Sequence, residues 1–222
     1  MRRLLYALVT VVAAAAAADA FGAAGDKEQH KFTAADQAAA KTAVVQKTDL
    51  AATAGWTGGA KKPDLSPPTP CANYDPKQSD LVLTGAAETD WKNTGLELDT
   101  EAQVLQTAHM VALDWQRTVA DPAAIACTKT TVQKNLSGGG GVKFVSFKRI
   151  AFPSVGTHSR AYLTTIEVTS QGTTVPITVE DVLIATKRTE ITITSTTAKV
   201  AQAAVAQADV RLAKILVARA KA

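Results

Sequence analysis

Alternation of apolar and polar residues is clearest in the second half of the chain. Four segments there are rich in Val, Ile, Thr and aromatic residues and alternate with a period of two, which is typical of β-strands with two different faces. They are residues 142–152, 160–170, 174–185 and 188–196. Gln171-Gly172 and Lys187-Arg188 separate the last three segments, and we expect hairpin turns there. The pattern therefore predicts an antiparallel sheet.

The middle of the chain changes to a helical period. Residues 107–120 carry an apolar stripe at 3.6-residue spacing. It consists of Ala108, Val111, Ala112, Trp115 and Val119. A second helix is expected after Asp121, the N-cap, with Pro122 at its first position. Its predicted inward stripe is Ile125, Thr128, Val132 and Leu136.

Shorter patterns complete the domain. Thr33 caps an Ala-rich helix that extends to Lys47, and strands are expected within 80–91 and 96–105. A long Ala-rich helix, 199–222, closes the chain. Sequential strands with helices at either end predict a single α+β domain over 33–222, an antiparallel sheet packed with helices.

The first twenty residues have the three parts of a secretory signal. Arg2 and Arg3 precede an apolar run, and Ala18-Asp19-Ala20 forms a small-residue cleavage site. We expect cleavage after Ala20, with an uncleaved anchor as the competing reading. Residues 21–32 would then be a flexible N-terminal segment, and no membrane span would remain. The pattern predicts a secreted protein, located outside the cell or in the cell wall.

Cys71 and Cys127 are the two cysteines of the chain. An even number in an oxidising compartment favours one disulfide, the alternative being two buried free thiols. Cys127 falls roughly opposite the inward stripe of its helix, so its sulfur would face outward. A Pro-rich strap, 57–76, could cross the helix there and bring Cys71 to it.

Charge and motifs exclude several function classes. The net charge of +4 is spread without a basic block, so we expect no nucleic-acid partner. No catalytic residue, metal ligand set or cofactor motif is recognised; the histidines are scattered and G-x-S-x-G is absent. Glu180 and Asp181 are adjacent on a predicted strand, so they point to opposite faces. We expect Glu180 to be a solvated charge at the rim, and we recognise no partner for Glu167 or Asp114.

Several segments together resemble a group of exported proteins from high-GC actinobacteria. They are the run 104–115, Cys127, the run 147–153 and the closing segment 208–214. That group is similar in outline to the extracellular sensor domains of mycobacterial serine/threonine kinases and to PsbP-like sandwiches. The resemblance implies a sandwich of helices on an antiparallel sheet.

The absence of a catalytic pattern favours a binding role. We expect a monomeric, non-enzymatic binding, sensor-like or accessory module of the bacterial cell envelope, with an unidentified small-molecule or envelope ligand. A cleft between the sheet and the 107–120 helix, edged by His109, Gln116 and Arg117, is the predicted ligand site. The alternatives are a hydrolase of envelope polymers and a purely structural secreted protein.

Overall fold

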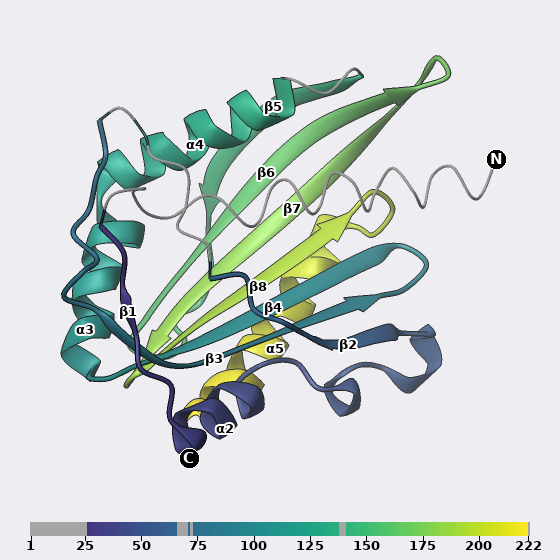
Figure 1. Cartoon of the computed structure of the whole chain (residues 1–222). Coiled ribbons are helices and arrows are strands. Elements are labelled where there is room, and N and C mark those ends of the chain that lie inside the picture. The colour runs from purple at the N-terminus through teal and green to yellow at the C-terminus, as the bar shows by residue number, and fades with distance from the viewer. Residues whose placement is uncertain (1–25, 66–70, 72, 138–140, 222) are drawn as a thin grey trace.

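The computed structural model describes residues 26–65, 71, 73–137 and 141–221. The predicted signal peptide and its cleavage site lie outside these residues. A single twisted sheet with helices on both faces forms the domain (Figure 1), which confirms the predicted α+β class. Within the described residues, no helix combines the length and apolar character that crossing a membrane requires.

The sheet has the order β1-β3-β4-β8-β7-β6-β5, and β2 also pairs with β3. Its strands are β1 (Gln29–His30), β2 (Thr57–Lys61), β3 (Val82–Lys92), β4 (Leu96–Leu105), β5 (Val142–Ile150), β6 (His158–Ser170), β7 (Thr173–Thr186) and β8 (Thr189–Thr197). All pairings are antiparallel except that of β1 with β3. The predicted strands are confirmed within a few residues. Gln171 and Lys187 have positive φ in the predicted turns, and Gly172 adopts the same left-handed backbone at no steric cost.

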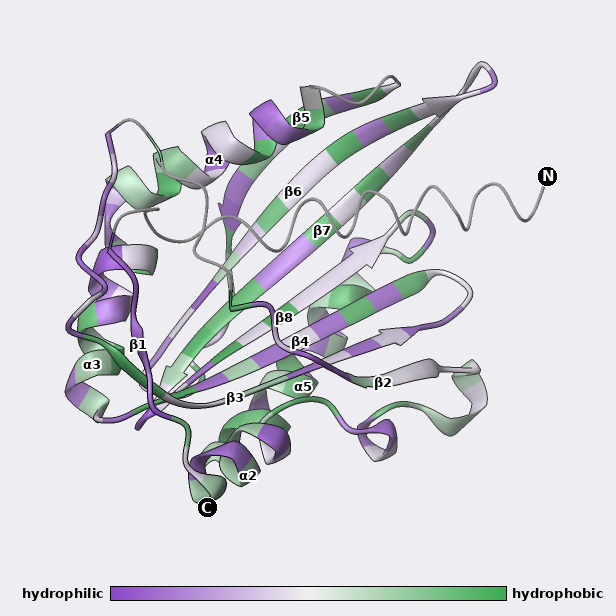
Figure 2. Ribbon diagram, viewed as in Figure 1, coloured by the Kyte–Doolittle hydropathy of each residue, from purple (hydrophilic) through white to green (hydrophobic). Residues whose placement is uncertain are grey.

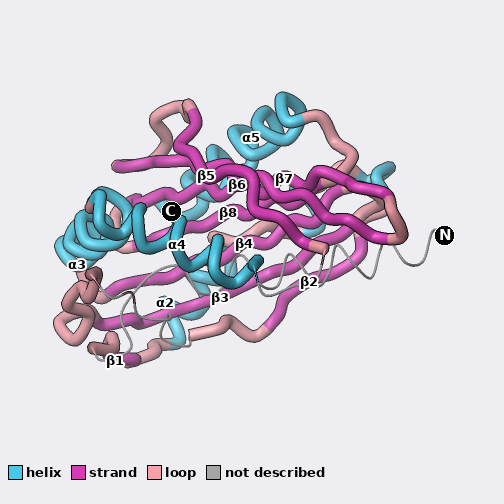
Figure 3. The backbone as a smooth tube through the Cα atoms, turned by 90° about the horizontal axis from the view of Figure 1, so that it is seen from above, coloured by secondary structure: helices cyan, strands magenta, loops and turns pink. Residues whose placement is uncertain are grey.

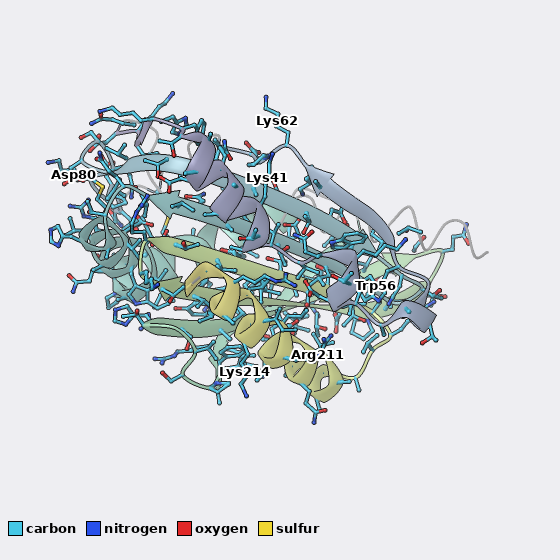
Figure 4. The ribbon with its side chains drawn as sticks, turned by 90° about the horizontal axis from the view of Figure 1, so that it is seen from below. Lys41, Trp56, Lys62, Asp80, Arg211 and Lys214 are labelled. Carbon is cyan, nitrogen blue, oxygen red and sulfur yellow. A yellow bond between two sulfur atoms is a disulfide. The ribbon has the colours of Figure 1, made fainter. Side chains whose placement is uncertain are left out.

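The helices are α2 (Ala34–Thr42), α3 (Ala108–Asp114), α4 (Pro122–Ser137) and α5 (Gln202–Lys221), with short 3₁₀ turns at Lys47–Asp49 and Ala52–Ala54. A π-helical turn, Trp115–Ala120, continues α3. α2 and α5 lie across one face of the sheet (Figure 4), which we call the α2/α5 face. α3 and α4 pack on the opposite, α3/α4 face, so α4 and α5 lie on different sides (Figure 3).

The main core lies between the α2/α5 face and its two helices. Apolar side chains of β3, β4, β7 and β8 contact those of α5, among them Leu212 and Leu216. Trp91 also donates its indole N–H to the carbonyl of Val45 at 3.1 Å. Gly85 allows α2 to approach the sheet closely, because a Cβ there would lie 2.2 Å from the carbonyl oxygen of Asp36. Trp56 packs half-buried against this core.

Two expected loop segments contain strands. Gln29–His30, within the segment 21–32 that we expected to be flexible, pairs with the start of β3. The Pro-rich strap, 57–76, begins with β2, which pairs with the end of β3. The glycines of β2 gave no strand pattern, and its hydrogen-bond partner, β3, is distant in sequence. Between them, β1 and β2 occupy both ends of the outer edge of β3.

Two predicted helical stripes need correction. Val111, Trp115 and Val119 are buried as expected, but Ala108 and Ala112 are exposed. Met110 and Leu113 are partly buried against the sheet on either side of this stripe. The helix is therefore oriented so that the two alanines face solvent. In α4 the predicted Thr128, Val132 and Leu136 are buried, whereas Ile125 is only half-buried.

Candidate binding face of the sheet

Apolar side chains pack between α3 and the sheet. Val111, Trp115 and Val119 pack directly against Tyr162 and Leu183 of the sheet. Burial of these apolar side chains holds the helix on the sheet.

The three residues expected to edge the predicted cleft differ in exposure and in partners. His109 and Gln116 are exposed. Arg117 is half-buried and held by Asp80, with nitrogen–oxygen distances of 2.7 and 3.1 Å, and it donates to the carbonyl of Lys77 at 2.6 Å. Arg117 therefore attaches the segment that follows the strap, Lys77 to Asp80, to the helix. A ligand role for His109, Gln116 and Arg117 stays a prediction.

The two cysteines lie at disulfide distance, with their Cα atoms 5.8 Å apart. They contact Tyr74 and Ala124 in a small cluster of their own. The Tyr74 hydroxyl donates to the carbonyl of Arg117 at 2.6 Å. Cys71 and Tyr74 of the strap thus contact α4 and its preceding turn, and Cys71 reaches Cys127 as the position of Cys127 suggested.

A different part of the α3/α4 face is rich in carboxylates. We call it the acidic face; its residues are Glu88 and Asp90 of β3, Glu97, Asp99 and Glu101 of β4, Asp181 of β7 and Glu190 of β8. The intervening residues of β3 and β4 point into the core on the other face, which fixes the side on which the acids lie. Figure 2 shows the resulting alternation of hydrophilic and hydrophobic positions along β4.

The strand register places like charges directly opposite one another. Glu88 is paired with Glu101, and Asp90 with Asp99. Side chains in such positions have Cβ atoms about 5 Å apart, and like charges there destabilise a sheet. The next position along reverses the pattern, because Lys92 is paired with Glu97 and contacts it at 2.7 Å.

A lysine from β2 partly compensates this repulsion. Lys61 lies 2.6 Å from Asp99 and 2.7 Å from Glu88. Burial alone would lower the pKa of Lys61, but these two carboxylates raise it. The ammonium group therefore stays charged. This contact shows that the acidic face accepts a primary ammonium between carboxylates of neighbouring strands.

Three carboxylates of the face hold protons more readily than free carboxylates. Burial raises the pKa of Asp99 to about 6, although Lys61 opposes the change. Burial and neighbouring acids raise the pKa of Glu101 to about 7, against a hydrogen bond from Gln103. Burial likewise raises the pKa of Asp181 to about 6.

The acidic face continues to α3. The pKa of Glu190 is raised by burial and by Asp114, which stands next to it. Asp114 also accepts a hydrogen bond from the Gln78 side chain at 3.4 Å, so the sequence analysis was wrong to leave it without a partner. Glu167, on β6, was likewise left unpartnered but contacts Lys143 at 3.1 Å.

Sequence reasoning missed this face. The sequence does contain acidic residues at alternate positions, at 88 and 90 and again at 97, 99 and 101. Such alternation also describes an ordinary solvated strand face, and only the register shows that acids stand opposite acids. Across the described residues, no group of three or more His, Cys, Asp or Glu has the geometry to hold a metal ion.

Comparisons with known proteins find solved structures of low similarity to this chain. No family model matches the chain, and no curated protein matches it. A solved structure of an uncharacterised protein from Mycobacterium smegmatis is similar at 12% identity and a TM-score of 0.47, over 84% of this chain and 98% of that one. The extracellular domain of PknH from Mycobacterium tuberculosis is similar at 10% identity and a TM-score of 0.36, over 63% of this chain and 66% of that one. Both match the expected resemblance in outline, at low identity.

Proposed function

We propose that the protein is a secreted, non-enzymatic binding module of the bacterial cell envelope that holds a cationic ligand on its acidic face. The signal sequence and the cysteine pair at disulfide distance support export. The observation that carries the ligand class is the pairing of Glu88 with Glu101 and of Asp90 with Asp99.

These two pairs of opposed carboxylates lower the stability of the folded sheet. Neutral residues would serve the sheet better at these positions, because directly opposed like charges destabilise it. Groups whose environment disfavours their charged form are concentrated at functional sites. A bound cation would relieve the repulsion, as Lys61 already does between Asp99 and Glu88.

The spacing of side chains on the sheet indicates the form of the ligand. Neighbouring strands lie about 4.8 Å apart, and alternate residues of one strand lie about 6.8 Å apart. Cations at similar spacing occur in an extended peptide with a basic residue at every second position. We therefore expect a basic peptide segment in extended conformation, lying along β3 and β4.

Hydrolysis of an envelope polymer is supported less well. Glycoside hydrolysis places two carboxyl groups on either side of the bond that is cleaved. The carboxylates here project from one side of a single sheet. That arrangement suits the binding of a charged chain better than its cleavage.

Isothermal titration with an alternating Lys-Thr peptide tests the proposal. The matched variants are Asp99→Asn and Glu101→Gln, which keep side-chain size and remove charge. Each should weaken binding roughly two- to fivefold at low salt, since partly exposed ion pairs contribute up to about 1 kcal/mol. Affinity should also fall as salt concentration rises.

Glu167→Gln is the control, because Glu167 is a carboxylate of the same sheet that pairs with Lys143 outside the acidic face. It should leave the affinity unchanged. An alternating Glu-Thr peptide should not bind. Equal affinities for the protein and for both acidic-face variants would refute the proposal, and so would release of fragments from cell-wall polymers at a rate that falls in Glu101→Gln.

A further inference from the structure

A buried polar cluster lies on the other face of the sheet, beneath the first half of α5. It comprises Glu180 of β7, Ser195 of β8, and Gln202 and Asp209 of α5. Glu180, Ser195 and Asp209 are each only 1% exposed. The expectation that Glu180 is a solvated rim charge is therefore wrong, because α5 covers that end of β7.

The strand register brings the two carboxyl groups together. Glu180 stands directly opposite Ser195 in the pairing of β7 with β8. The Ser195 hydroxyl donates to Asp209 Oδ1 at 2.8 Å. The Gln202 side-chain amide donates to Glu180 Oε2. Both carboxyl groups thus flank the same serine.

Three buried oxygens of this cluster have no donor. They are Glu180 Oε1, Gln202 Oε1 and Asp209 Oδ2. All three are acceptors in the ionised cluster, and a buried acceptor without a donor costs about 1–3 kcal/mol. Two neighbouring buried negative charges would cost considerably more.

No cation in the described part of the chain compensates these charges. The other charged side chains that the structure describes on α5 and on the neighbouring α2 are directed elsewhere. Arg211, Lys214 and Lys41 are exposed, Arg219 pairs with Asp49, and Asp36 pairs with Arg188. Asp181, the next residue on β7, lies on the acidic face and hydrogen-bonds to Thr194.

We infer that Glu180 and Asp209 form a proton-binding site, in which Asp209 carries a proton at neutral pH. A proton on Asp209 Oδ2 turns one unpartnered acceptor into a donor. One of the two buried charges is then removed. The site lies across the sheet from the acidic face and is independent of the proposed ligand.

The pKa of Asp209 agrees with this inference. Burial raises it to about 8, the Ser195 hydrogen bond opposes the change and the Glu180 carboxylate adds to it. An aspartate in the unfolded chain has a pKa near 3.9. The native state therefore binds the proton more tightly, so its stability falls as pH rises from about 4 to about 8. Alkaline pH would weaken the attachment of α5 to the sheet.

Urea unfolding between pH 5 and pH 9 tests the inference, with Asp209→Asn as the variant. Asparagine keeps the size of the protonated side chain and cannot ionise. As pH rises towards 8, the unfolding equilibrium constant of the unsubstituted protein should increase relative to that of Asp209→Asn. The increase should be up to about tenfold per pH unit. Asp75→Asn is the same change at an exposed position. The ratio of its unfolding equilibrium constant to that of the unsubstituted protein should not change with pH.

Parallel stability curves for the protein and Asp209→Asn would overturn the inference. A calcium-dependent rise in the midpoint that is lost in Asp209→Asn would also overturn it, because a metal ion would then occupy the site. If the variant does not fold, the ¹³C signal of the Asp209 carboxyl group decides in the unsubstituted protein. A titration midpoint above pH 7 is expected, and one below pH 5 would refute the inference.

Discussion

Arg219 and Asp49 form an ion pair that joins the last turn of α5 to the segment after α2. One guanidinium nitrogen lies 2.8 Å from Asp49 Oδ2, and the other contacts Oδ1. Asp49 is 9% exposed and also accepts a hydrogen bond from the amide of Gln46 at 2.7 Å. The pair thus secures the far end of α5, whose first half covers the proton-binding site.

Arg219→Met should destabilise the protein by about 3 kcal/mol, because Asp49 would stay buried without its cation. Urea unfolding measures the effect. Lys214→Met, on the exposed side of the same helix, should change stability by less than about 0.5 kcal/mol. Equal midpoints for the two variants would show that the pair does not hold α5.

Trp115→Ala should cost about 3–5 kcal/mol in urea unfolding, from lost burial and the cavity left behind. Trp115 is 7% exposed, packs in the core under α3 and stacks on His158 with ring centroids 5.3 Å apart. The exposed neighbour Gln116→Ala is the control and should be nearly silent; Arg117 is unsuitable because it pairs with Asp80. A near-normal midpoint for Trp115→Ala would contradict the placement of this helix.

Cys71 and Cys127 should both resist alkylation in the protein before reduction. Their separation of 56 residues corresponds to about 4 kcal/mol of stabilisation on the loop-entropy model. Reduction should therefore lower the urea midpoint markedly. Mass analysis that finds two alkylated cysteines in unreduced protein would disprove the bridge.

Sequencing of the protein recovered from culture medium should give Phe21 as its first residue. This follows from the cleavage site at Ala18-Asp19-Ala20. Recovery of a chain that begins with Met1 would refute cleavage of the signal.

Periodicity alone gave most of the fold. The expected strand 96–105 coincides with β4, because apolar and polar residues alternate over most of its length. β2 was not predictable, since Gly58 and Gly59 have low strand propensity and the strand depends on pairing with β3. Local sequence contains no information on that distant partner.

The candidate sites could not be predicted from the sequence, because they depend on strand register and on which parts of the sheet the helices cover. That Glu101 faces Glu88 follows from the hairpin register of β3 and β4, which the spacing of single residues does not reveal. Burial of Glu180 depends on α5 crossing β7, and an isolated strand pattern cannot show which face a distant helix covers. His109 and Arg117 were predicted as site residues because they are polar groups beside an apolar stripe, a pattern that also occurs at ordinary helix boundaries.

The binding of a cationic chain to the acidic face is tested most directly by amide NMR during titration with the alternating Lys-Thr peptide. Since the pKa values of Asp99 and Glu101 are raised to about 6 and about 7, these groups become fully charged only above neutral pH. Affinity should therefore increase from pH 5 to pH 8, and signals of β3 and β4 should shift while those of α5 do not. Shifts confined to α5 or to the α3 helix, or binding that weakens as pH rises, would contradict the proposed function.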